Sequence, residues 1–381
     1  MIYFDNAATS YPKPLSVAKE VTKCIKSYCG NPGRGAHSLS RISSEKIYEA
    51  REEIASFFGS DKPENVFFTY NDTYALNMVI KGLLAKGDHV IISDMEHNSV
   101  YRPIVCLAEK GIVEFNIFDT MCLSEERSAK NICEGIKRLI NPRTKMLIAT
   151  HSSNICSAAL PIREIGALCR SMGIIFVLDA AQSAGHLTID IEQDNIDILC
   201  APGHKGLYGI QGSGFAVLRD GILPRPIIEG GSGVNSLEVR MPEISPERFE
   251  AGTLAVPSVA ALCEGIKFVN DRGVEEIHEH ECSLFNRALD MLSSFEQVEV
   301  YAPMHIGSSL LFNVDSIPCE RLSDMLDSYG ICTRAGYHCS PLGHKTLGTL
   351  DRGAVRISFS PFNTMKELEF FYSVMKSILL C

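Results

Sequence analysis

The chain carries at residues 197–206 the stretch Asp197-Ile198-Leu199-Cys200-Ala201-Pro202-Gly203-His204-Lys205-Gly206. It starts as a short apolar run, which predicts a buried strand, and it then turns at a glycine. A lysine held between two glycines and beside a histidine is placed to be buried against a ligand. Ligands of open α/β sheets gather outside the carboxyl ends of the strands. The stretch therefore predicts an α/β fold with a site at Lys205.

Six further runs of the same kind alternate with helical stretches between about residues 60 and 220. Their apolar character is continuous, which is typical of strands covered on both faces by helices. We therefore predict an α/β domain with a mostly parallel sheet of seven strands. The other six runs are Val66–Thr69, His89–Ser93, Val113–Ile117, Met146–Thr150, Ile174–Leu178 and Phe215–Leu218.

The pattern of apolar residues changes after about residue 260, where longer helices and fewer strands are expected. This change predicts a large domain over residues 15–260 and a smaller α+β domain over residues 261–381. We expect residues 1–14 to join the two by folding back. The elements expected in the smaller domain and at its border are helices at Pro257–Arg272 and Val274–Phe295, and strands at Gly307–Val314 and Ala354–Ser358.

The composition favours a cytoplasmic enzyme without nucleic-acid or membrane partners. The 381 residues include 36 basic and 46 acidic groups, a net charge of −10 without long blocks of one sign. The first residues lack a basic start followed by an apolar run, and no stretch of about 18 apolar residues occurs. The 14 cysteines are therefore expected to be reduced thiols.

Polar residues follow three of the other predicted strands. The segment Tyr70-Asn71-Asp72-Thr73 enters a helix expected over Ala75–Leu84, whose free N–H groups and hydroxyl suit a phosphate. His97 follows the next strand, where an imidazole can stack on a planar ring. Asp179 ends a third strand and has no basic residue near it in sequence. Taken alone, His97 and Lys205 fit surface or packing positions, and Asp179 fits a helix cap.

Together these residues match the needs of pyridoxal 5'-phosphate. An imine of Lys205 would pre-activate the aldehyde for exchange with a substrate amine. Asp179 would keep the ring nitrogen protonated, because an opposite charge nearby favours the protonated form. Lys205, once released, would act as the base that moves the proton. The pattern thus predicts a cofactor-dependent enzyme acting on amino acids.

The chain also resembles the class V aminotransferases, in particular the second group of cysteine desulfurases and selenocysteine lyases. The resemblance implies the fold type I of pyridoxal-phosphate-dependent transferases. It spans almost the whole chain, in the same order and spacing. The matching segments are 4–10, 68–77, 95–100, 178–182, 203–205, 248–253, 334–339 and 355–358.

The resemblance implies a role in cofactor binding for nine residues. Lys205 is similar to the Schiff-base lysine, His97 to the ring-stacking residue and Asp179 to the partner of the pyridinium nitrogen. The remaining six are Gln182 at the ring hydroxyl, Thr73, Asp72 and His204 at the phosphate, Asn154 between cofactor and substrate, and Thr253, which reaches the phosphate of the other subunit and implies a homodimer.

The resemblance further implies that the substrate is L-cysteine or a related amino acid. Arg356 resembles the arginine that grips the substrate carboxylate, a task suited to its bidentate fork. Asn154, Arg334 and Ala8 are expected beside the substrate. We expect no metal.

Cys339 is the residue that points to desulfuration. In the desulfurases a cysteine at this place attacks the substrate sulfur, leaving alanine and a persulfide destined for a sulfur-acceptor protein. Nearby His338 and Arg334 are expected to favour the reactive thiolate. The alternative is an inert thiol, but a loop flanked by Gly336 and Pro341 is poor ground for a core residue.

Two substitutions and one loop depart from the pattern of the family. Pro202 stands where serine or threonine is usual, so one phosphate hydrogen bond is missing. Asp72 stands where a small or hydroxyl residue is usual, and its carboxylate is expected to point away from a phosphate or to cap the helix. The loop Ser340–Thr346, with residues 98–103, is closer to a less-characterised desulfurase-like branch.

Several alternatives remain open at this stage. Selenocysteine lyase and cystine or cysteine lyase activity use the same fold and the same lysine and arginine. An aminotransferase would leave the Cys339 loop without a purpose, and a non-catalytic pyridoxal-phosphate-binding protein would not need the competent residues found. A zinc site of His338, Cys339 and His344 would need a fourth ligand. The cluster His278, His280 and Cys282 has one member on the wrong helix face.

Overall fold

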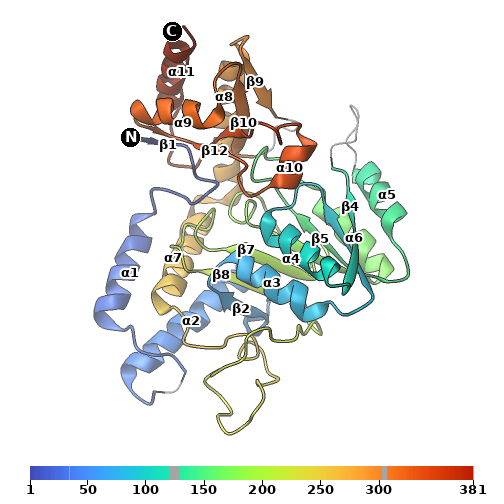
Figure 1. Cartoon of the computed structure of the whole chain (residues 1–381). Coiled ribbons are helices and arrows are strands. Elements are labelled where there is room, and N and C mark those ends of the chain that lie inside the picture. The colour runs from blue at the N-terminus through green and yellow to red at the C-terminus, as the bar shows by residue number, and fades with distance from the viewer. Residues whose placement is uncertain (34, 121–128, 303–306, 381) are drawn as a thin grey trace.

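A seven-stranded sheet forms the centre of the computed structural model, which describes residues 1–33, 35–120, 129–302 and 307–380 (Figure 1). The strand order is β2-β8-β7-β6-β5-β3-β4. β8 is antiparallel to both neighbours, and the remaining adjacent pairs are parallel. The predicted sheet is confirmed. Its strands are β2 (Val66–Thr69), β3 (Asp88–Ser93), β4 (Val113–Phe118), β5 (Thr144–Thr150), β6 (Ile175–Asp179), β7 (Ile198–Pro202) and β8 (Gly214–Leu218).

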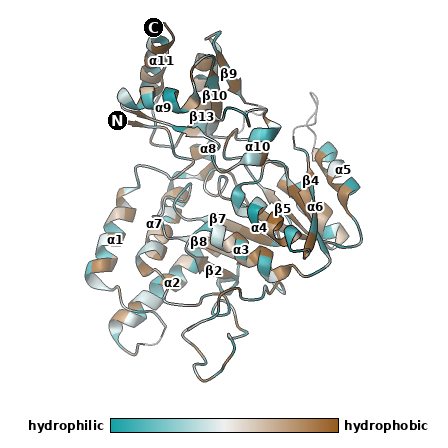
Figure 2. Ribbon diagram, in the orientation of Figure 1, coloured by the Kyte–Doolittle hydropathy of each residue, from teal (hydrophilic) through white to brown (hydrophobic). Residues whose placement is uncertain are grey.

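Helices cover both faces of this sheet. Successive strand residues point to opposite faces, so Leu147 joins one core cluster while Met146 and Ile148 join the other. This two-sided burial explains the continuous apolar runs, seen as brown strands in Figure 2. None of the helices in the described ranges is long and apolar enough to cross a membrane. The helices are α1 (Leu15–Ser27), α2 (Ser38–Phe57), α3 (Asp72–Leu83), α4 (Asn98–Glu109), α5 (Ala129–Leu139), α6 (Ile162–Met172) and α7 (Val256–Arg272).

The remaining α-helices and strands of the described chain form a smaller body with its own apolar core (Figure 1). It holds an antiparallel sheet, β12-β13-β10-β9, and a parallel pair of β1 and β11. β1 comes from the N-terminus, so the first residues belong to this body. Its elements are β1 (Ile2–Tyr3), α8 (Val274–Ser293), β9 (Val298–Tyr301), β10 (Ser309–Val314), α9 (Cys319–Ser328), β11 (Ile331–Cys332), β12 (Arg334–Gly336), α10 (Pro341–Thr346), β13 (Ala354–Ser358) and α11 (Met365–Leu380).

The division into two domains stays a prediction, and the packing of α7 bears on its boundary. The predicted boundary between residues 260 and 261 falls within α7. Val259, Leu262 and Ile266 of this helix all join the core of the seven-stranded sheet. We therefore propose that the boundary follows Arg272.

The first helix after β2 begins earlier than the sequence predicts. α3 starts at Asp72 rather than Ala75, because the side chain of Asn71 accepts a hydrogen bond from the Tyr74 N–H (2.9 Å) and caps the helix. Asp72 is therefore the first helical residue. We expected its carboxylate to point away from a phosphate or to cap the helix, and the second of these expectations is wrong because Asn71 is the cap.

A buried ion pair fastens the long segment after β8 to the central sheet. Arg51 of α2 donates from Nη2 to Oε2 of Glu250 (2.5 Å), and Glu250 Oε1 accepts from the N–H of Phe68 in β2 (2.7 Å). The guanidinium carbon lies 4.7 Å from the centre of the Phe68 ring. Because both charges are buried, losing either one leaves the other unpaired in an apolar setting.

We predict that Glu250→Gln lowers the free energy of unfolding by about 3–5 kcal/mol, because it leaves the buried Arg51 charge uncompensated. Urea unfolding followed by circular dichroism measures this loss. Glu114→Gln is the control, since its pair with Arg143 lies at the surface and should contribute little. Equal stability of the Glu250 variant and the unaltered chain would contradict the prediction.

Candidate active site

A cavity of about 180 Å³ lies at the carboxyl ends of β5, β6 and β7 and the start of α3. Eight residues predicted from the sequence as cofactor ligands line it. They are Asp72, Thr73, His97, Asn154, Asp179, Gln182, His204 and Lys205. The remaining lining residues are Asn71, Ser99, Thr150, Ala181 and Pro202. The structure thus brings these eight residues to one cavity, and their roles as cofactor ligands stay predictions.

A lysine and two carboxyl groups share this cavity with two histidines. Burial lowers the pKa of Lys205, although the nearby charges of Asp179 and Asp72 raise it. Burial also raises the pKa of Asp179, against the hydrogen bond that its Oδ1 accepts from the Ala181 N–H (2.9 Å). A lysine with a lowered pKa is more often a neutral amine, which is the nucleophilic form.

The N-terminal segment clasps the turn that carries Lys205. Ser10 Oγ donates to the Lys205 carbonyl (2.8 Å), and Lys13 Nζ donates to the His204 carbonyl (2.7 Å). The next residue must be glycine, since a Cβ at Gly206 would lie 2.4 Å from the Ala184 carbonyl oxygen. The turn is therefore held on both sides, which fixes where the Lys205 side chain starts.

A chain of hydrogen bonds orients His97. Its Nδ1 accepts from the Ser99 N–H (3.1 Å) and lies 2.7 Å from Ser99 Oγ, which in turn lies 2.7 Å from Thr73 Oγ1. Burial, with the charge of Lys205, lowers the pKa of His97 to about 4. Because Nδ1 accepts, the neutral ring carries its hydrogen on Nε2. The same lowering to about 4, again led by burial, holds for His204, whose Nδ1 lies 3.0 Å from Thr9 Oγ1.

Gln182 and Asn154 connect the cavity to other segments. Gln182 Nε2 donates to the Ala7 carbonyl (2.9 Å), which keeps one amide hydrogen for the cavity. Asn154 Nδ2 donates to the His338 carbonyl (2.8 Å). Ala8, predicted beside the substrate, lies in the tight N-terminal turn where its N–H donates to the Asp5 carbonyl (3.1 Å).

Arg356 enters the site from β13 of the smaller body and is 2% exposed. Its Nη1 donates to the Asn154 carbonyl (2.9 Å) and its Nη2 to Asp5 Oδ1 (2.7 Å). Its Nε has no hydrogen-bond partner among the described residues. Arg334, which pairs with Arg356 across β12 and β13, is exposed. Both arginines lower the pKa of Lys205 through their charges, so they lie near the cavity.

Cys339 is exposed on a loop fastened to the cavity lining. The Cys339 carbonyl accepts from the Asn98 N–H (2.8 Å), next to His97, and Asn154 holds His338 as described above. His338 and Cys339 have φ angles of 49° and 55°. Two successive non-glycine residues in the left-handed region are strained, and such strain persists only where the surroundings impose it.

A buried histidine pair imposes this conformation. His338 Nε2 lies 3.3 Å from the Arg334 carbonyl, its Nδ1 lies 3.2 Å from His344 Nε2, and His344 Nδ1 lies 2.7 Å from Thr349 Oγ1. Burial lowers the pKa of both rings, so each is neutral. Because the Arg334 carbonyl can only accept, each ring carries its hydrogen on Nε2 and accepts on Nδ1. The hydrogen bonds therefore lead from Thr349 through His344 and His338 to the Arg334 carbonyl, and each ring nitrogen has a partner.

This arrangement corrects two readings of the sequence. Burial and the Arg356 charge lower the pKa of His338 to about 2, so His338 is neutral and cannot favour a Cys339 thiolate by charge as we expected. The two histidine nitrogens that face one another share a hydrogen bond, so a zinc ion cannot lie between them. The sequence groups His344 with His338 only as possible zinc ligands and does not predict their hydrogen bond.

Thr253 does not line the cavity of its own chain. It is exposed and lies in the segment after Glu250, where it borders two other cavities. Within one chain the structure thus brings Thr253 neither to Lys205 nor to Thr73.

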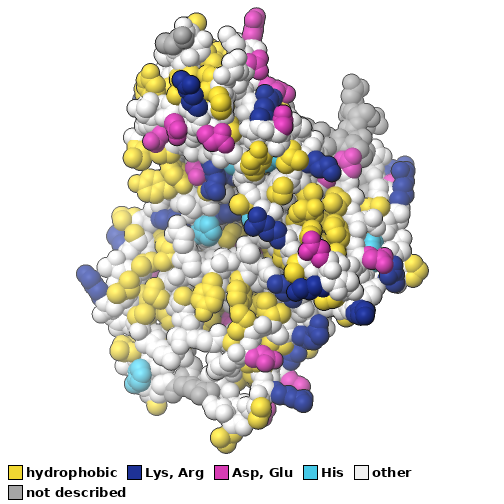
Figure 3. All heavy atoms as spheres, in the orientation of Figure 1, with side chains coloured by type: hydrophobic (Ala, Val, Ile, Leu, Met, Phe, Trp, Pro, Cys, Tyr) yellow, Lys and Arg dark blue, Asp and Glu magenta, His cyan; other side chains and the backbone are white. Residues whose placement is uncertain are grey.

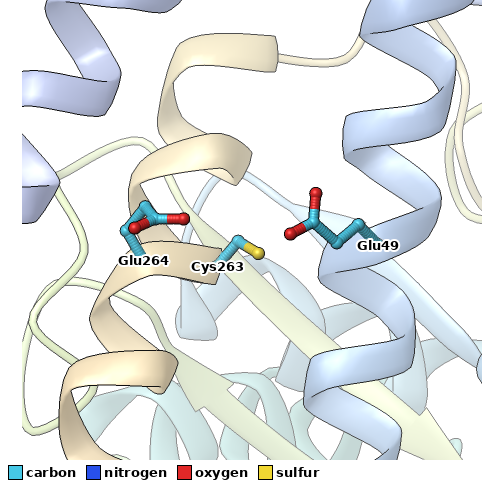
Figure 4. A group of neighbouring side chains, drawn as sticks. All are labelled: Glu49, Cys263 and Glu264. Carbon is cyan, nitrogen blue, oxygen red and sulfur yellow. The ribbon is translucent and has the colours of Figure 1, made fainter.

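Among the described residues, three possible metal ligands converge at Glu49, Cys263 and Glu264 (Figure 4). Lys46 Nζ already lies 3.1 Å from Glu49 and 3.5 Å from Glu264, and Lys267 contacts both carboxylates as well. Burial raises the pKa of Cys263 to about 12. The group is therefore an ion-pair network with a neutral thiol rather than a cation site. His280, one of the three residues clustered on α8, bonds instead to the Asn363 carbonyl (3.0 Å).

Glu96 is a site-supporting residue to which the sequence assigned no role. It is fully buried, and its Oε1 accepts from the Thr150 N–H (2.8 Å) and from the Ser93 hydroxyl. It thereby joins the end of β3 to the end of β5. Burial raises its pKa to about 8, although these hydrogen bonds lower it.

Comparisons with known proteins agree with this geometry. A family model described as aminotransferase class-V matches residues 2–371. A probable cysteine desulfurase of Methanothermobacter thermautotrophicus is 31% identical, with 99% of this chain and 94% of the relative aligned. A cysteine desulfurase of Haloferax volcanii is also 31% identical, with 97% and 87% aligned. The predicted family resemblance is confirmed.

Two solved structures share the fold over nearly the whole chain. The apo structure of a cysteine desulfurase from Thermococcus onnurineus has a TM-score of 0.91 at 31% identity, covering 99% of this chain and 94% of that one. A cysteine desulfurase of Escherichia coli has a TM-score of 0.89 at 25% identity, with the same coverage. The predicted fold class is confirmed.

We predict that Glu96 makes folding stability depend on pH. Between 4.5, its usual pKa, and about 8, the folded chain holds a proton that the unfolded chain has released. This contribution to the free energy of unfolding therefore falls as pH rises, by up to about 1.4 kcal/mol per pH unit. Urea titrations at pH 5, 6, 7 and 8 should show the unaltered chain losing stability relative to Glu96→Gln. Parallel pH curves for the two proteins would rule this out.

Proposed function

The chain belongs to the aminotransferase class-V family, and on that premise we propose that it is a pyridoxal-phosphate-dependent cysteine desulfurase that converts L-cysteine to L-alanine. One observation carries the proposal. A cavity lined by Lys205, Asp179 and His97 has an exposed thiol, Cys339, on a loop fastened to its lining at Asn98 and Asn154. The relatives named above, cysteine desulfurases or probable ones, support the same activity.

The donors in the cavity fit the proposed cofactor. Its phosphate would lie at the start of α3, where free N–H groups meet the Thr73 hydroxyl and the His204 ring. Asp179, raised in pKa by burial, would gain a cationic partner in the protonated ring nitrogen. The neutral His97 ring would stack on the cofactor, and Gln182 would donate its free amide hydrogen to the ring hydroxyl. When bound, the cofactor supplies an electron sink for bond breaking at the substrate Cα.

Lys205 would hold the cofactor covalently and then serve as the proton carrier. Burial lowers its pKa, which favours the free amine, and the free amine can both attack an aldehyde and accept a proton. The Ser10 and Lys13 contacts fix the turn on which it lies. The amine therefore needs little reorganisation between these two tasks.

Arg356 would bind the substrate carboxylate. Two of its nitrogens are held by Asn154 and Asp5, which orient the guanidinium plane, while Nε is buried without a partner among the described residues. An unpaired buried donor is costly, and a carboxylate would satisfy it. Arg334 and Ala8 would border the same substrate.

Cys339 would perform the sulfur transfer. Its Sγ attacks the substrate sulfur, the bond between that sulfur and the substrate Cβ breaks, and a proton goes to the carbon product. L-Alanine leaves, and the sulfur remains on Cys339 as a persulfide. The exposure of Cys339 would let a sulfur-acceptor protein reach the persulfide.

A homodimer would complete the proposed phosphate-binding site. Thr253 is exposed and away from the cavity of its own chain, so its proposed phosphate contact needs a second subunit. Large apolar side chains are exposed on α2 and beside α3, on the face seen in Figure 3, and on the segment after β8. Burying these side chains against a second copy would favour association. They are Leu39, Ile42, Tyr48, Tyr70, Leu237, Val239 and Ile244.

We predict that the purified protein, loaded with pyridoxal phosphate, is yellow and releases alanine from L-cysteine, and that Cys339→Ala lowers this release at least about 100-fold, as removal of a nucleophile should. Alanine is measured by chromatography and sulfide by colorimetry. Cys29→Ala is the matched control, because Cys29 is also exposed but lies on the loop after α1.

The outcomes separate the alternatives. A yellow protein whose Cys339 variant keeps full activity on selenocysteine but not on cysteine would favour a lyase. A yellow protein without activity on any amino acid would favour a non-catalytic binding protein. A colourless protein would contradict the assignment of Lys205 as the residue that holds the cofactor.

We also predict that Arg356→Gln raises KM for L-cysteine by about 10- to 100-fold, the usual cost of losing a charged hydrogen bond. Cysteamine lacks the carboxylate, so its turnover should change little. Steady-state kinetics with both compounds measure the difference. Arg352→Gln, whose side chain instead contacts Glu299, should leave both unchanged, and an equal loss on both compounds for Arg356→Gln would contradict the assignment.

A further inference from the structure

Asp72 places a second carboxyl group in the proposed cofactor cavity. It is the first residue of α3 and 7% exposed, and its side chain lines the cavity beside Asp179 and Lys205. Its Oδ1 has no hydrogen-bond partner among the described residues. The backbone at Asp72 cannot shift toward β8 to move the carboxyl out of the cavity. Asn71 and Asp72 pack directly against Gly214 of β8, where a Cβ would lie 2.4 Å from the Asn71 carbonyl carbon.

The surrounding charges leave no cation for Asp72 once a cofactor is bound. The groups that act on Asp72 are Asp179, which ends β6, and Lys205, which follows β7. The thiol of Cys200 in β7 also feels the Asp72 charge, and burial raises the pKa of this thiol well above its usual value, so it is neutral. Lys205 would be used by the covalent link and Asp179 by the ring nitrogen.

The histidines of the cavity do not supply positive charge either. His97 and His204 both have pKa values lowered to about 4, chiefly by burial. Pro202, at the end of β7, has no side-chain donor. A phosphate at the start of α3 would therefore meet an ionised Asp72 with only neutral donors, the helix N–H groups, the Thr73 hydroxyl and the His204 ring, to offset the repulsion.

Burial raises the pKa of Asp72 well above its usual value, and the Asp179 charge adds to this. This shift favours the carboxylic acid over the carboxylate. In its neutral form a buried carboxyl has an O–H group to donate.

Resting on the proposed function, we propose that Asp72 carries a proton in the loaded enzyme and donates its O–H to a phosphate oxygen of the cofactor, so that cofactor binding takes up one proton from water. This donor would replace the hydroxyl that Pro202 lacks. Any rise in pH that ionises Asp72 in the empty protein would then weaken cofactor binding.

The test measures the dissociation constant of pyridoxal phosphate for the cofactor-free chain between pH 6 and 9.5, from its visible absorption. Titrations of the cofactor itself cancel in the ratio between the unaltered chain and Asp72→Asn, whose amide is neutral and donates at every pH. We expect this ratio to rise at least 10-fold over the range. Calorimetry in two buffers of different ionisation enthalpy should show up to one more proton taken up by the unaltered chain.

Three controls make the result specific. Asp72→Ser, with its hydroxyl donor, should behave like Asp72→Asn and guards against a fold defect in one variant. Glu114→Gln removes a surface carboxyl that does not line the cavity, and it should leave the pH dependence of cofactor binding unchanged. Pyridoxal lacks the phosphate, so the same ratio measured with it should be flat.

A ratio for pyridoxal phosphate that stays constant with pH overturns the proposal, and a pyridoxal ratio that rises equally would move the Asp72 contact away from the phosphate and overturn it as well. Failure of the proposed function is distinct, because a chain that does not bind the cofactor would give no yellow complex at any pH, and a chain that binds it without desulfurating cysteine would still give the binding ratio.

Discussion

The site depends on one electrostatic constraint, which is that Lys205, Asp179 and Asp72 share a small buried space. Charges that leave water are costly unless they are paired or neutralised. The one lysine cannot balance the charge of two carboxylates. Burial lowers the pKa of the lysine and raises the pKa of both carboxyl groups. The nearby imidazoles are neutral for the same reason. A cofactor that brings a cationic ring nitrogen would relieve this imbalance at Asp179, while its anionic phosphate would add to the negative charge near Asp72.

The two bodies of the chain supply different halves of this site. The seven-stranded sheet provides the cavity at its strand ends, as open α/β sheets do, while β13 and the loop before α10 provide Arg356 and Cys339. The halves are joined by hydrogen bonds at the rim, from Asn98 to Cys339 and from Asn154 to His338. The same contacts that join the bodies therefore orient the groups proposed to bind and attack the substrate.

The Cys339 loop shows how local strain is offset by distant partners. Two left-handed residues in succession are unfavourable by themselves. The pair of His338 and His344 anchors the two left-handed residues to Thr349 and to the Arg334 backbone. Every donor in this series of hydrogen bonds has an acceptor. Fully satisfied buried networks of this kind hold one conformation. The exposed thiol can thus sit on a loop that is itself fixed.

The sequence by itself determined the sheet and the strand-end residues, because continuous apolar runs and the polar residues that follow them are local features. It did not determine the start of α3 at Asp72, the neutral state of His338 or the role of Glu96. Arg356 and its partner Asp5 are 351 positions apart, and no local pattern links them. Burial and long-range pairing set the charge states of these groups, and only the tertiary structure decides both.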